Sequence, residues 1–324
     1  MSSMEETVAH KRMLFDRSLS IASRGRLARV GRWILLVSLL CSLGFGVPFS
    51  VHAATAIEFT GGELLGVPTD TSVVVNIVPA AAIEYYYEYG TSPGVYSGQT
   101  PLVTAAANAP SEVVISGLTP NTQYYYRMRY HAPGDGPTDW VLRGENRFHT
   151  QRARGDTFVF TVTSDSHATF NSNHQTAMVN VLADQPDFNL DLGDTFYVDN
   201  KTNQSQVNSS YLTYRGPLYL GKIGPSVPIF LASGNHENEE GWNLDDTPFS
   251  IAVGSTQARK AYYPTPVSDG FYSGNSDPLA SIDEGTYGDE LREDYYAWEW
   301  GDALFVVIDP FQYTMNLPYS PVAG

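Results

Sequence analysis

The chain is short of cysteine, of basic residues and of long apolar segments. Its 324 residues include one cysteine, Cys41, which excludes an intramolecular disulfide and a zinc site built from several thiolates. The sequence also contains no glycine-rich phosphate loop, no CxxC pair and no nucleophile elbow. These absences argue against P-loop nucleotide hydrolysis, thiol redox chemistry and serine-hydrolase chemistry.

Basic residues are scarce, with 19 Lys plus Arg against 35 Asp plus Glu and a formal net charge of −16. Seven of the basic and three of the acidic residues lie in the first 53 positions, so the remainder carries a net charge of −20. Such a surface repels polyanions, whereas nonspecific nucleic-acid binding needs clustered Lys and Arg. The composition therefore argues against a nucleic-acid partner.

The one long apolar segment lies near the amino terminus and has the layout of a signal peptide. Seven basic residues precede an apolar core of about 15 residues from Trp33 to Val47, and Val51-His52-Ala53 offers small residues at the cleavage positions. We therefore expect residues 1–53 to direct export to a periplasmic or extracellular location. A bilayer span needs about 20 apolar residues, so membrane association would come only from an uncleaved leader.

Residues 54–151 are predicted to form a separate all-β module. Four strand-like runs are separated by Gly, Pro, Ser and Thr clusters, a spacing typical of a β-sandwich of about 100 residues. The runs are Ser72–Val78, Ala82–Tyr89, Glu112–Ile115 and Tyr124–Tyr130. The stretch Leu118-Thr119-Pro120-Asn121-Thr122-Gln123-Tyr124 resembles the fibronectin type III signature, in which a tyrosine corner closes the sandwich. An ordinary turn before a strand is the alternative. Such a module would pack beside the following domain or bind an extracellular surface.

From residue 152 onward, three apolar strand-like runs each end in potential metal ligands. Phe158–Ser164 leads to Asp165 and His167, and Phe188–Leu192 leads to Asp194. Val227–Ser233 leads to Gly234-Asn235-His236-Glu237. Open α/β sheets place their chemistry at the carboxyl ends of strands, and the intervals of about 30 and about 40 residues suit helical crossovers. The blocks are therefore predicted to lie at the carboxyl ends of sheet strands.

Asp165 and His167 can reach one ion only if the backbone bends, because residues two apart on a regular strand lie on one face about 6.6 Å apart, a spacing that suits one ion between them. A carboxylate beside an imidazole suits Zn, Fe or Mn better than Ca, which prefers oxygen ligands alone. A single Gly-Asn-His-Glu stretch would more often be a capped turn. Its position after two other ligand-bearing blocks favours a metal site.

These three blocks resemble the calcineurin-like metallophosphoesterase superfamily, which includes the purple acid phosphatases. Its pattern runs Asp-x-His, Gly-Asp and Gly-Asn-His-Glu in the same order. The resemblance implies a phosphoesterase in which two metal ions (Fe, Zn or Mn) activate water against a phosphate ester. It assigns Asp165 and His167 to the first ion, Asp194 to a bridge between the ions, and the Asn235 side-chain oxygen to the second.

The same resemblance implies catalytic roles for His236 and Glu237. His236 would lie near the leaving-group oxygen as a general acid or a phosphate contact, and Glu237 would orient it by accepting a ring N–H. A solvated carboxylate at a helix start is the alternative for Glu237. Tyr197, three residues after Asp194, matches an iron-ligating tyrosine of purple acid phosphatases. Those enzymes have glycine at the position of His167, so Tyr197 is either a metal ligand or a residue of the core or of the site's surroundings.

The superfamily completes its metal sites with a later lone histidine and a Gly-His-x-His block, whereas this chain has no histidine after His236. Glu293–Ala303 and Leu304–Asp309 are predicted to form a hairpin whose second strand is fully buried. We therefore expect residues 152–324 to be the incomplete amino-terminal part of a metallophosphoesterase domain, with weak metal binding and little turnover by the chain itself. The alternative is a secreted binding or adhesion protein built on the same domains that has lost catalysis.

The predicted fold is thus multidomain: an all-β, fibronectin III-like sandwich followed by an α/β metallophosphoesterase domain, itself a β-sandwich flanked by helices. An aromatic, turn-rich stretch from Lys260 to Asn275 is expected to line the mouth of the site or to pack against the surface.

Overall fold

The computed structural model describes residues 56–136, 139–167, 172–243, 249–274 and 291–309. The predicted leader and residues 310–324 lie outside these ranges. The segment His52–Gly324 forms one compact unit. Within the described ranges, no helix combines the length and the apolar character that a membrane span requires.

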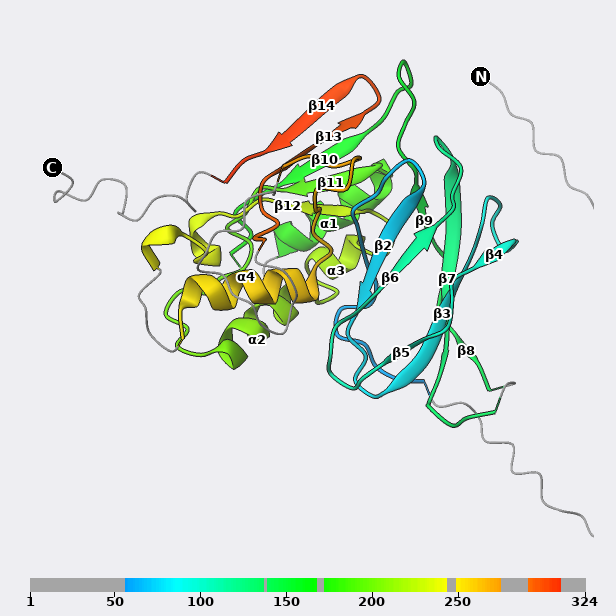
Figure 1. The fold of residues 1–324 in the computed structure, drawn as a ribbon, viewed down its shortest axis with the longest axis horizontal. Coiled ribbons are helices and arrows are strands. Elements are labelled where there is room, and N and C mark those ends of the chain that lie inside the picture. The colour runs from blue at the N-terminus through cyan, green and yellow to red at the C-terminus, as the bar shows by residue number, and fades with distance from the viewer. Residues whose placement is uncertain (1–55, 137–138, 168–171, 244–248, 275–290, 310–324) are drawn as a thin grey trace, which may run out of the picture. The chain divides into compact units, whose positions relative to one another are not determined.

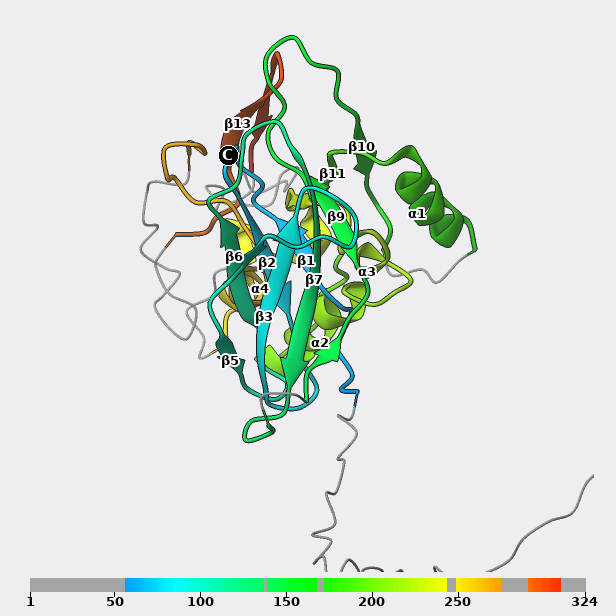
Figure 2. The ribbon, with the colours of Figure 1, turned by 90° about the vertical axis from the view of Figure 1, so that its right-hand side faces the viewer.

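Residues 64–149 form two antiparallel sheets around one core (Figures 1 and 2). The first sheet contains β1 (Leu64–Gly66), β2 (Ser72–Ile77) and β6 (Ser111–Ser116). The second sheet is built on the pairing of β3 (Ile83–Gly90) with β7 (Gln123–His131). Four short strands extend it: β4 (Gly98–Gln99), β5 (Val103–Ala105), β8 (Val141–Leu142) and β9 (Asn146–His149). All four predicted strands are present, each within one residue of its expected bounds.

Alternating burial along β3 and β7 builds the core of this module. Tyr85 and Tyr87 on β3 and Tyr124 and Tyr126 on β7 are buried, and partly exposed residues alternate with them. At the corner before β7, the Thr119 N–H donates to the Tyr124 hydroxyl oxygen over 2.9 Å. This is the geometry of a tyrosine corner, which ties the turn after β6 to the start of β7.

The second part of the chain is built on a parallel sheet of β10 (Phe160–Thr163), β11 (Phe188–Asp191) and β12 (Ile229–Leu231). Helix α1 (Ser172–Asp184) connects β10 to β11. Helices α2 (Gln204–Tyr214) and α3 (Leu220–Ile223) lie between β11 and β12, and α4 (Ile251–Tyr262) follows. The predicted α/β alternation is confirmed, and its parallel register brings the three carboxyl ends to one edge of the sheet.

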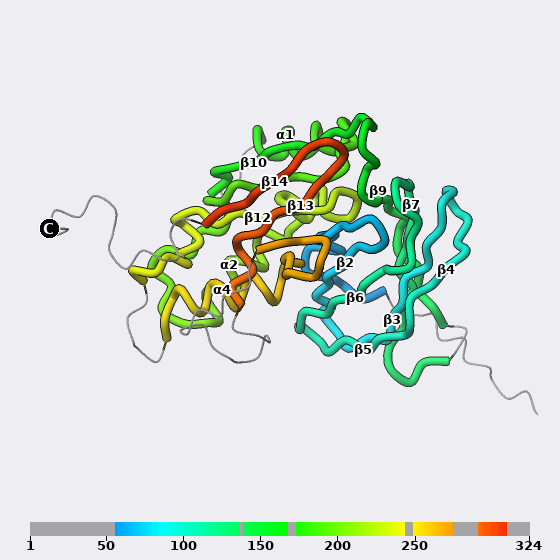
Figure 3. The backbone as a smooth tube through the Cα atoms, turned by 45° about the horizontal axis from the view of Figure 1, so that its top comes forward, coloured from blue at the N-terminus to red at the C-terminus, as the bar shows by residue number. Residues whose placement is uncertain are grey.

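The sheet is covered on both faces. Ile229 and Leu231 on β12 pack in one core with residues of all four helices, whereas Phe230 faces the opposite side. There the Phe230 ring stacks on Trp298 with 4.0 Å between centroids. Trp298 belongs to β13 (Tyr296–Trp300), which pairs with β14 (Ala303–Val307) in a hairpin lying beside β10 (Figure 3). Helices therefore cover one face and an aromatic hairpin the other.

The hairpin prediction is confirmed, but the expectation that its second strand is fully buried is wrong. Burial alternates along β14: Phe305 packs inward, while Leu304 is 66% exposed and Val306 is 59% exposed. Among the described strands, β14 pairs with β13 alone, and the side chains on its outward face are exposed. A continuous apolar run predicts a strand that is covered on both faces, whereas β14 is covered on one face only.

The sandwich packs directly against the α/β domain through a buried arginine. Arg215, just after α2, is 0% exposed, and its Nη1 donates to Asn76 Oδ1 on β2 over 2.7 Å. The same guanidinium also donates to four main-chain carbonyl oxygens, those of Thr60, Gly62, Asn76 and Tyr262. Burial lowers the pKa of Arg215 to about 10. One cation thus satisfies acceptors from both domains.

The aromatic stretch after residue 260 contributes to the contact between the two domains and does not lie at the mouth of the site. Tyr262 and Tyr263 are buried in the core under the helices. Tyr272 is buried beside the hairpin, and its hydroxyl donates to the Pro68 carbonyl oxygen over 2.5 Å. The expectation of a mouth-lining loop is therefore wrong for the described residues of this stretch.

Candidate metal centre

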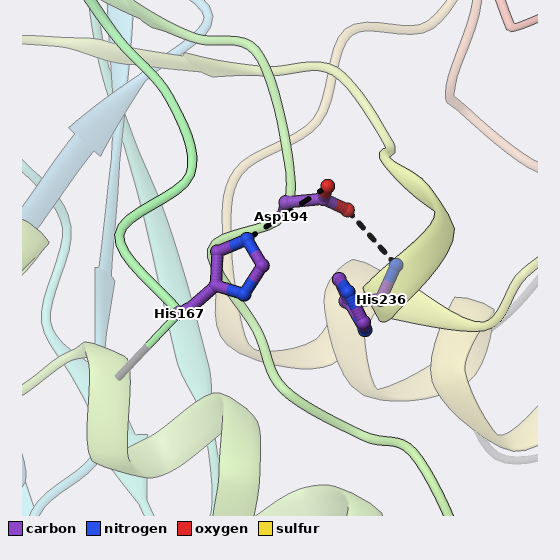
Figure 4. A group of neighbouring side chains, drawn as sticks. All are labelled: His167, Asp194 and His236. Carbon is purple, nitrogen blue, oxygen red and sulfur yellow. Dashed lines mark hydrogen bonds and ion pairs between the residues drawn. The ribbon is translucent and has the colours of Figure 1, made fainter. Parts of the chain in front are cut away.

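The three ligand-bearing blocks meet at the carboxyl edge of the parallel sheet. Main-chain hydrogen bonds join the loop after β10 to the loop after β11: Asp165 N–H donates to Gly193 O over 3.0 Å, and His167 N–H to Asp194 O over 3.1 Å. The loop after β12 is joined to Asp194 by the His236 N–H, which donates to Asp194 Oδ1 over 2.9 Å. Figure 4 shows His167, Asp194 and His236 from these three loops side by side.

Two glycines allow the second and third loops to approach this closely. A Cβ atom on Gly193 would lie 2.3 Å from Gly234 N, and Gly193 also has a φ of +91°. A Cβ atom on Gly234 would lie 2.3 Å from Asp194 Oδ1. Both contacts are far inside van der Waals distance, so any side chain would force the loops apart. The glycines of the Gly-Asp and Gly-Asn-His-Glu blocks thus set the position of Asp194.

The resulting donor set fits a transition-metal ion. The candidate ligand atoms of His167, Asp194 and His236 all lie within 4.8 Å of one another. His167 Nε2 lies 3.9 Å from Asp194 Oδ2 and 3.5 Å from Asp165 Oδ1. An imidazole with two carboxylates suits Zn, Fe or Mn, and a catalytic zinc needs three protein ligands. His167, Asp165 and Asp194 can therefore hold an ion, with His236 beside them.

The backbone at the candidate ligands adopts a conformation that side chains disfavour. Asp165, His167 and Asp194 have φ values of +55°, +44° and +53°. Residues other than glycine in this left-handed region cost of order 1–3 kcal/mol each and persist where the surroundings impose them. The hydrogen bonds to Gly193 O and Asp194 O hold Asp165 and His167 in this conformation. Directing the ligand side chains toward one another therefore lowers the stability of the fold.

Glu237 does not orient His236 and is not a solvated carboxylate. It is 1% exposed and accepts four main-chain hydrogen bonds. Its Oε1 accepts the N–H groups of Thr195 and Phe196 over 2.7 and 2.9 Å, and its Oε2 accepts those of Asp194 and Gly234 over 3.0 and 2.7 Å. Burial raises the pKa of Glu237 to about 7, against the opposing effect of these donors. Glu237 therefore clamps the loop that carries Asp194.

The residue that orients His236 is Asp199. His236 Nδ1 lies 2.7 Å from Asp199 Oδ2, so the ring N–H at Nδ1 donates to the carboxylate and Nε2 takes no part in this bond. Burial lowers the pKa of His236, but the Asp199 hydrogen bond and charge outweigh it, and the pKa is raised. Sequence reasoning missed Asp199, although its place five residues after Asp194, in the same loop, was visible.

Comparison with known families agrees with this geometry. Residues 158–305 match the sequence pattern of the calcineurin-like phosphoesterase family. Those residues hold β10 to β12 with their loops and most of the hairpin. This part of the chain is a calcineurin-like phosphoesterase domain. No curated protein matches the chain by sequence.

Solved structures share the fold of the chain at low sequence identity. A structure of PhoD superposes with a TM-score of 0.56 at 19% identity, covering 79% of this chain and 52% of that one. Purple acid phosphatase PPD1 from yellow lupin (Lupinus luteus) seeds gives a TM-score of 0.50 at 15% identity, covering 75% of this chain and 43% of that one. The chain therefore spans about half the length of these two proteins.

Two further predicted ligands of the phosphoesterase domain lie beside its three central donors. Asn235 is exposed and precedes His236 in a short 3₁₀ turn, η1 (Asn235–Glu237). Tyr197 is 44% exposed, so it does not belong to the core. Its ring stacks on His236 with 5.0 Å between centroids and lies 6.3 Å from the ring of His167. Tyr197 thus forms one wall of the site.

Asp191, which sequence reasoning also missed, supports the loop that carries Gly193, Asp194 and Thr195. It is the last residue of β11 and is 2% exposed. Its carboxylate accepts bonds from the Thr163 hydroxyl over 3.0 Å, the Thr195 hydroxyl over 2.5 Å and the Gly193 N–H over 3.2 Å. Burial raises its pKa to about 6. Asp191 lies inside a run that reads as an apolar strand, which hid its role.

Proposed function

We propose that this protein is an exported, metal-dependent phosphoesterase that hydrolyses phosphate esters at a dinuclear centre. The observation that carries the proposal is the convergence of His167, Asp194 and His236 within 4.8 Å in a calcineurin-like phosphoesterase domain. Asp165 and His167 would hold the first ion, Asp194 would bridge, and the Asn235 side-chain oxygen would reach the second. Bound cations would supply Lewis-acid activation of a water and of the phosphoryl group.

The chain's own side chains account for binding, orientation and proton transfer. Asp199 accepts from His236 Nδ1 and raises the pKa of the ring, which favours its protonated form. In the doubly protonated ring, Nε2–H can donate to the leaving-group oxygen as a general acid. Tyr197 stacks on this ring and fixes its plane. Because the protein carries a net charge of −16, the cations themselves would attract the substrate.

We extend the proposal to the other parts of the chain. Residues 1–53 would be an export leader, residues 54–151 a fibronectin III-like module and residues 152–324 the phosphoesterase domain. Two antiparallel sheets and the Tyr124 corner support the fibronectin-like assignment. Its contacts with the α/β domain through Arg215 and Tyr272 support a role in bracing that domain.

The central test is Asp194→Asn. The amide keeps the shape of the side chain but loses the charge that would bridge two cations, so bound Zn or Mn should fall, and the p-nitrophenyl phosphate turnover that the wild-type chain shows should drop about a hundredfold or more. Metal content by mass spectrometry and initial rates measure both. The matched control is Asp184→Asn, at the exposed end of α1, which should change neither. Equal metal content and equal turnover in the two variants would refute the proposal.

A second test addresses the proton on His236. Asp199→Asn keeps a hydrogen-bond acceptor near Nδ1 but removes the charge that raises the pKa of His236. Turnover should fall about 10- to 100-fold. A general acid must be protonated, so activity is lost when the pH rises above its pKa. A lower pKa of His236 therefore moves this loss to a lower pH. The alkaline limb of the pH–rate profile should therefore move to lower pH. A profile identical to that of Asp184→Asn would contradict the assigned role.

A further inference from the structure

A cavity of about 400 Å³ lies where the sandwich meets the segment after α4. Val74 and Val114, on β2 and β6, contribute apolar wall from the sandwich. Pro264 and Val267 contribute it from the α/β domain. None of the lining residues is a candidate ligand of the metal centre. The lining is mixed, with five apolar side chains and seven polar or charged ones. Clefts of this size at domain boundaries are where proteins bind small molecules.

The charged groups in this cavity leave Glu112 without an ion pair. Lys260 Nζ lies 3.1 Å from Glu293 Oε1 and donates to Leu291 O over 2.6 Å, so this lysine is committed to its own domain. Glu112, on the opposite wall, accepts a hydrogen bond from Asn76 Nδ2 over 2.9 Å. Within the described residues it forms no ion pair. The residue is exposed and lines the cavity, and burial of its carboxyl group raises its pKa to about 7, against the opposing effects of the Asn76 hydrogen bond and the Arg215 charge.

A further carboxylate, that of Asp269, also lines the cavity. Glu112, Glu293 and Asp269 against Lys260 give the walls an excess of negative charge. Among the described residues, the group close enough to hold a metal ion is that of His167, Asp194 and His236, and the cavity carboxylates do not form another. An organic ligand with an apolar body and one positive charge would match both the walls and Glu112.

The backbone around the cavity is held in strained conformations. Val67 and Glu293, which both line it, have φ values of +49° and +59°. A β-branched residue in this region is a genuine outlier, and such strain clusters at ligand sites. The two domains also approach each other closely beside the cavity, since a Cβ atom on Gly66 would lie 2.8 Å from Pro264 Cβ.

We propose that this cavity is a second ligand site that binds a small organic ammonium compound, with Glu112 as counter-ion and the valine and proline walls enclosing its apolar part. The site is separate from the metal centre in its residues and its chemistry. A ligand there would touch both domains at once and would stabilise their contact by mass action.

The test compares three probes of the same shape: 4-phenylbutylamine, 4-phenylbutanol and 4-phenylbutyrate. Saturation-transfer NMR on the full chain at about pH 8.5, above the pKa of Glu112, measures their binding. We expect the amine to bind with a Kd of about 1 mM or tighter, and the alcohol and the acid at least about tenfold more weakly. Equal binding of all three, or no binding of the amine at about 10 mM, would overturn the proposal.

Two substitutions locate the site. Val114→Trp fills the cavity from a side chain that is 51% exposed, so it should abolish amine binding while the melting temperature stays unchanged. Glu112→Gln keeps an acceptor for Asn76 and removes the charge, so amine affinity should fall about tenfold while alcohol binding is unaffected. Amine binding that survives Val114→Trp would place the ligand elsewhere and refute the assignment.

Discussion

Replacing Arg215 by methionine should lower the free energy of unfolding by about 3 kcal/mol, because several buried acceptors lose their donor together. The guanidinium donates to Asn76 Oδ1 and to four main-chain carbonyl oxygens, none of which methionine can satisfy. Removing the buried charge recovers part of this loss, since desolvation already lowers the pKa of Arg215 to about 10. The balance is unfavourable because each unpaired acceptor costs about 1–3 kcal/mol.

Urea unfolding of the purified protein measures this effect, and its shape carries further information. Arg215 joins Thr60, Gly62 and Asn76 of the sandwich to Tyr262 of the α/β domain. Without it, the two domains should unfold in two separate transitions where the wild type shows one. Arg154→Met is the matched control, because Arg154 is 75% exposed and pairs with an exposed glutamate. If Arg215→Met and Arg154→Met unfold at the same midpoint in one transition, the contact does not depend on Arg215.

The sequence was sufficient to predict the parts of the fold that depend on local pattern. Runs of apolar residues ending in ligands located β10, β11 and β12, and their chain order with intervening helices implied a parallel sheet. Parallel register then requires that Asp194 and the Gly-Asn-His-Glu turn lie at one edge. Strand-like runs between clusters of turn residues likewise located β3 and β7. In each of these segments, the spacing of the residues along the strand determines which side chains are buried.

Features that depend on contacts between distant segments were not predictable in this way. Asp199 and Glu237 are both carboxylates near His236, and chain distance favoured Glu237, its neighbour. The η1 turn directs Glu237 inward to main-chain N–H groups 41 to 43 residues away, which leaves the ring to Asp199 across 37 residues. Similarly, the composition of β14 predicted burial, but burial depends on whether a second layer is present, which a single strand does not encode.

Replacing Glu237 by glutamine should lower the free energy of unfolding nearly as much as the replacement of Arg215 by methionine. Each carboxylate oxygen of Glu237 accepts two main-chain N–H groups. A glutamine side chain has one oxygen, so in either orientation two N–H groups face an NH₂ group that cannot accept. We expect a loss of about 3 kcal/mol of unfolding free energy, at about 1–3 kcal/mol for each buried unsatisfied group.

The same substitution three residues later is a matched control. Glu240 is 3% exposed, burial raises its pKa to about 8, and its Oε2 accepts one bond, from Asn243 Nδ2 over 2.8 Å. Glutamine therefore reproduces the hydrogen bonding of Glu240, and Glu240→Gln should cost less than about 1 kcal/mol.

The two variants should also differ in metal binding. Glu237 fixes the N–H groups of Asp194, Thr195 and Phe196, so Glu237→Gln releases the loop that presents the Asp194 carboxylate. Affinity for Zn or Mn, measured by isothermal titration below the unfolding temperature, should fall about 10- to 100-fold, as for other residues that orient a ligand. Glu240→Gln should retain the wild-type affinity. If both variants bind metal as the wild type does, the clamp contributes stability alone, and Asp194 must be positioned by its bond from the His236 N–H.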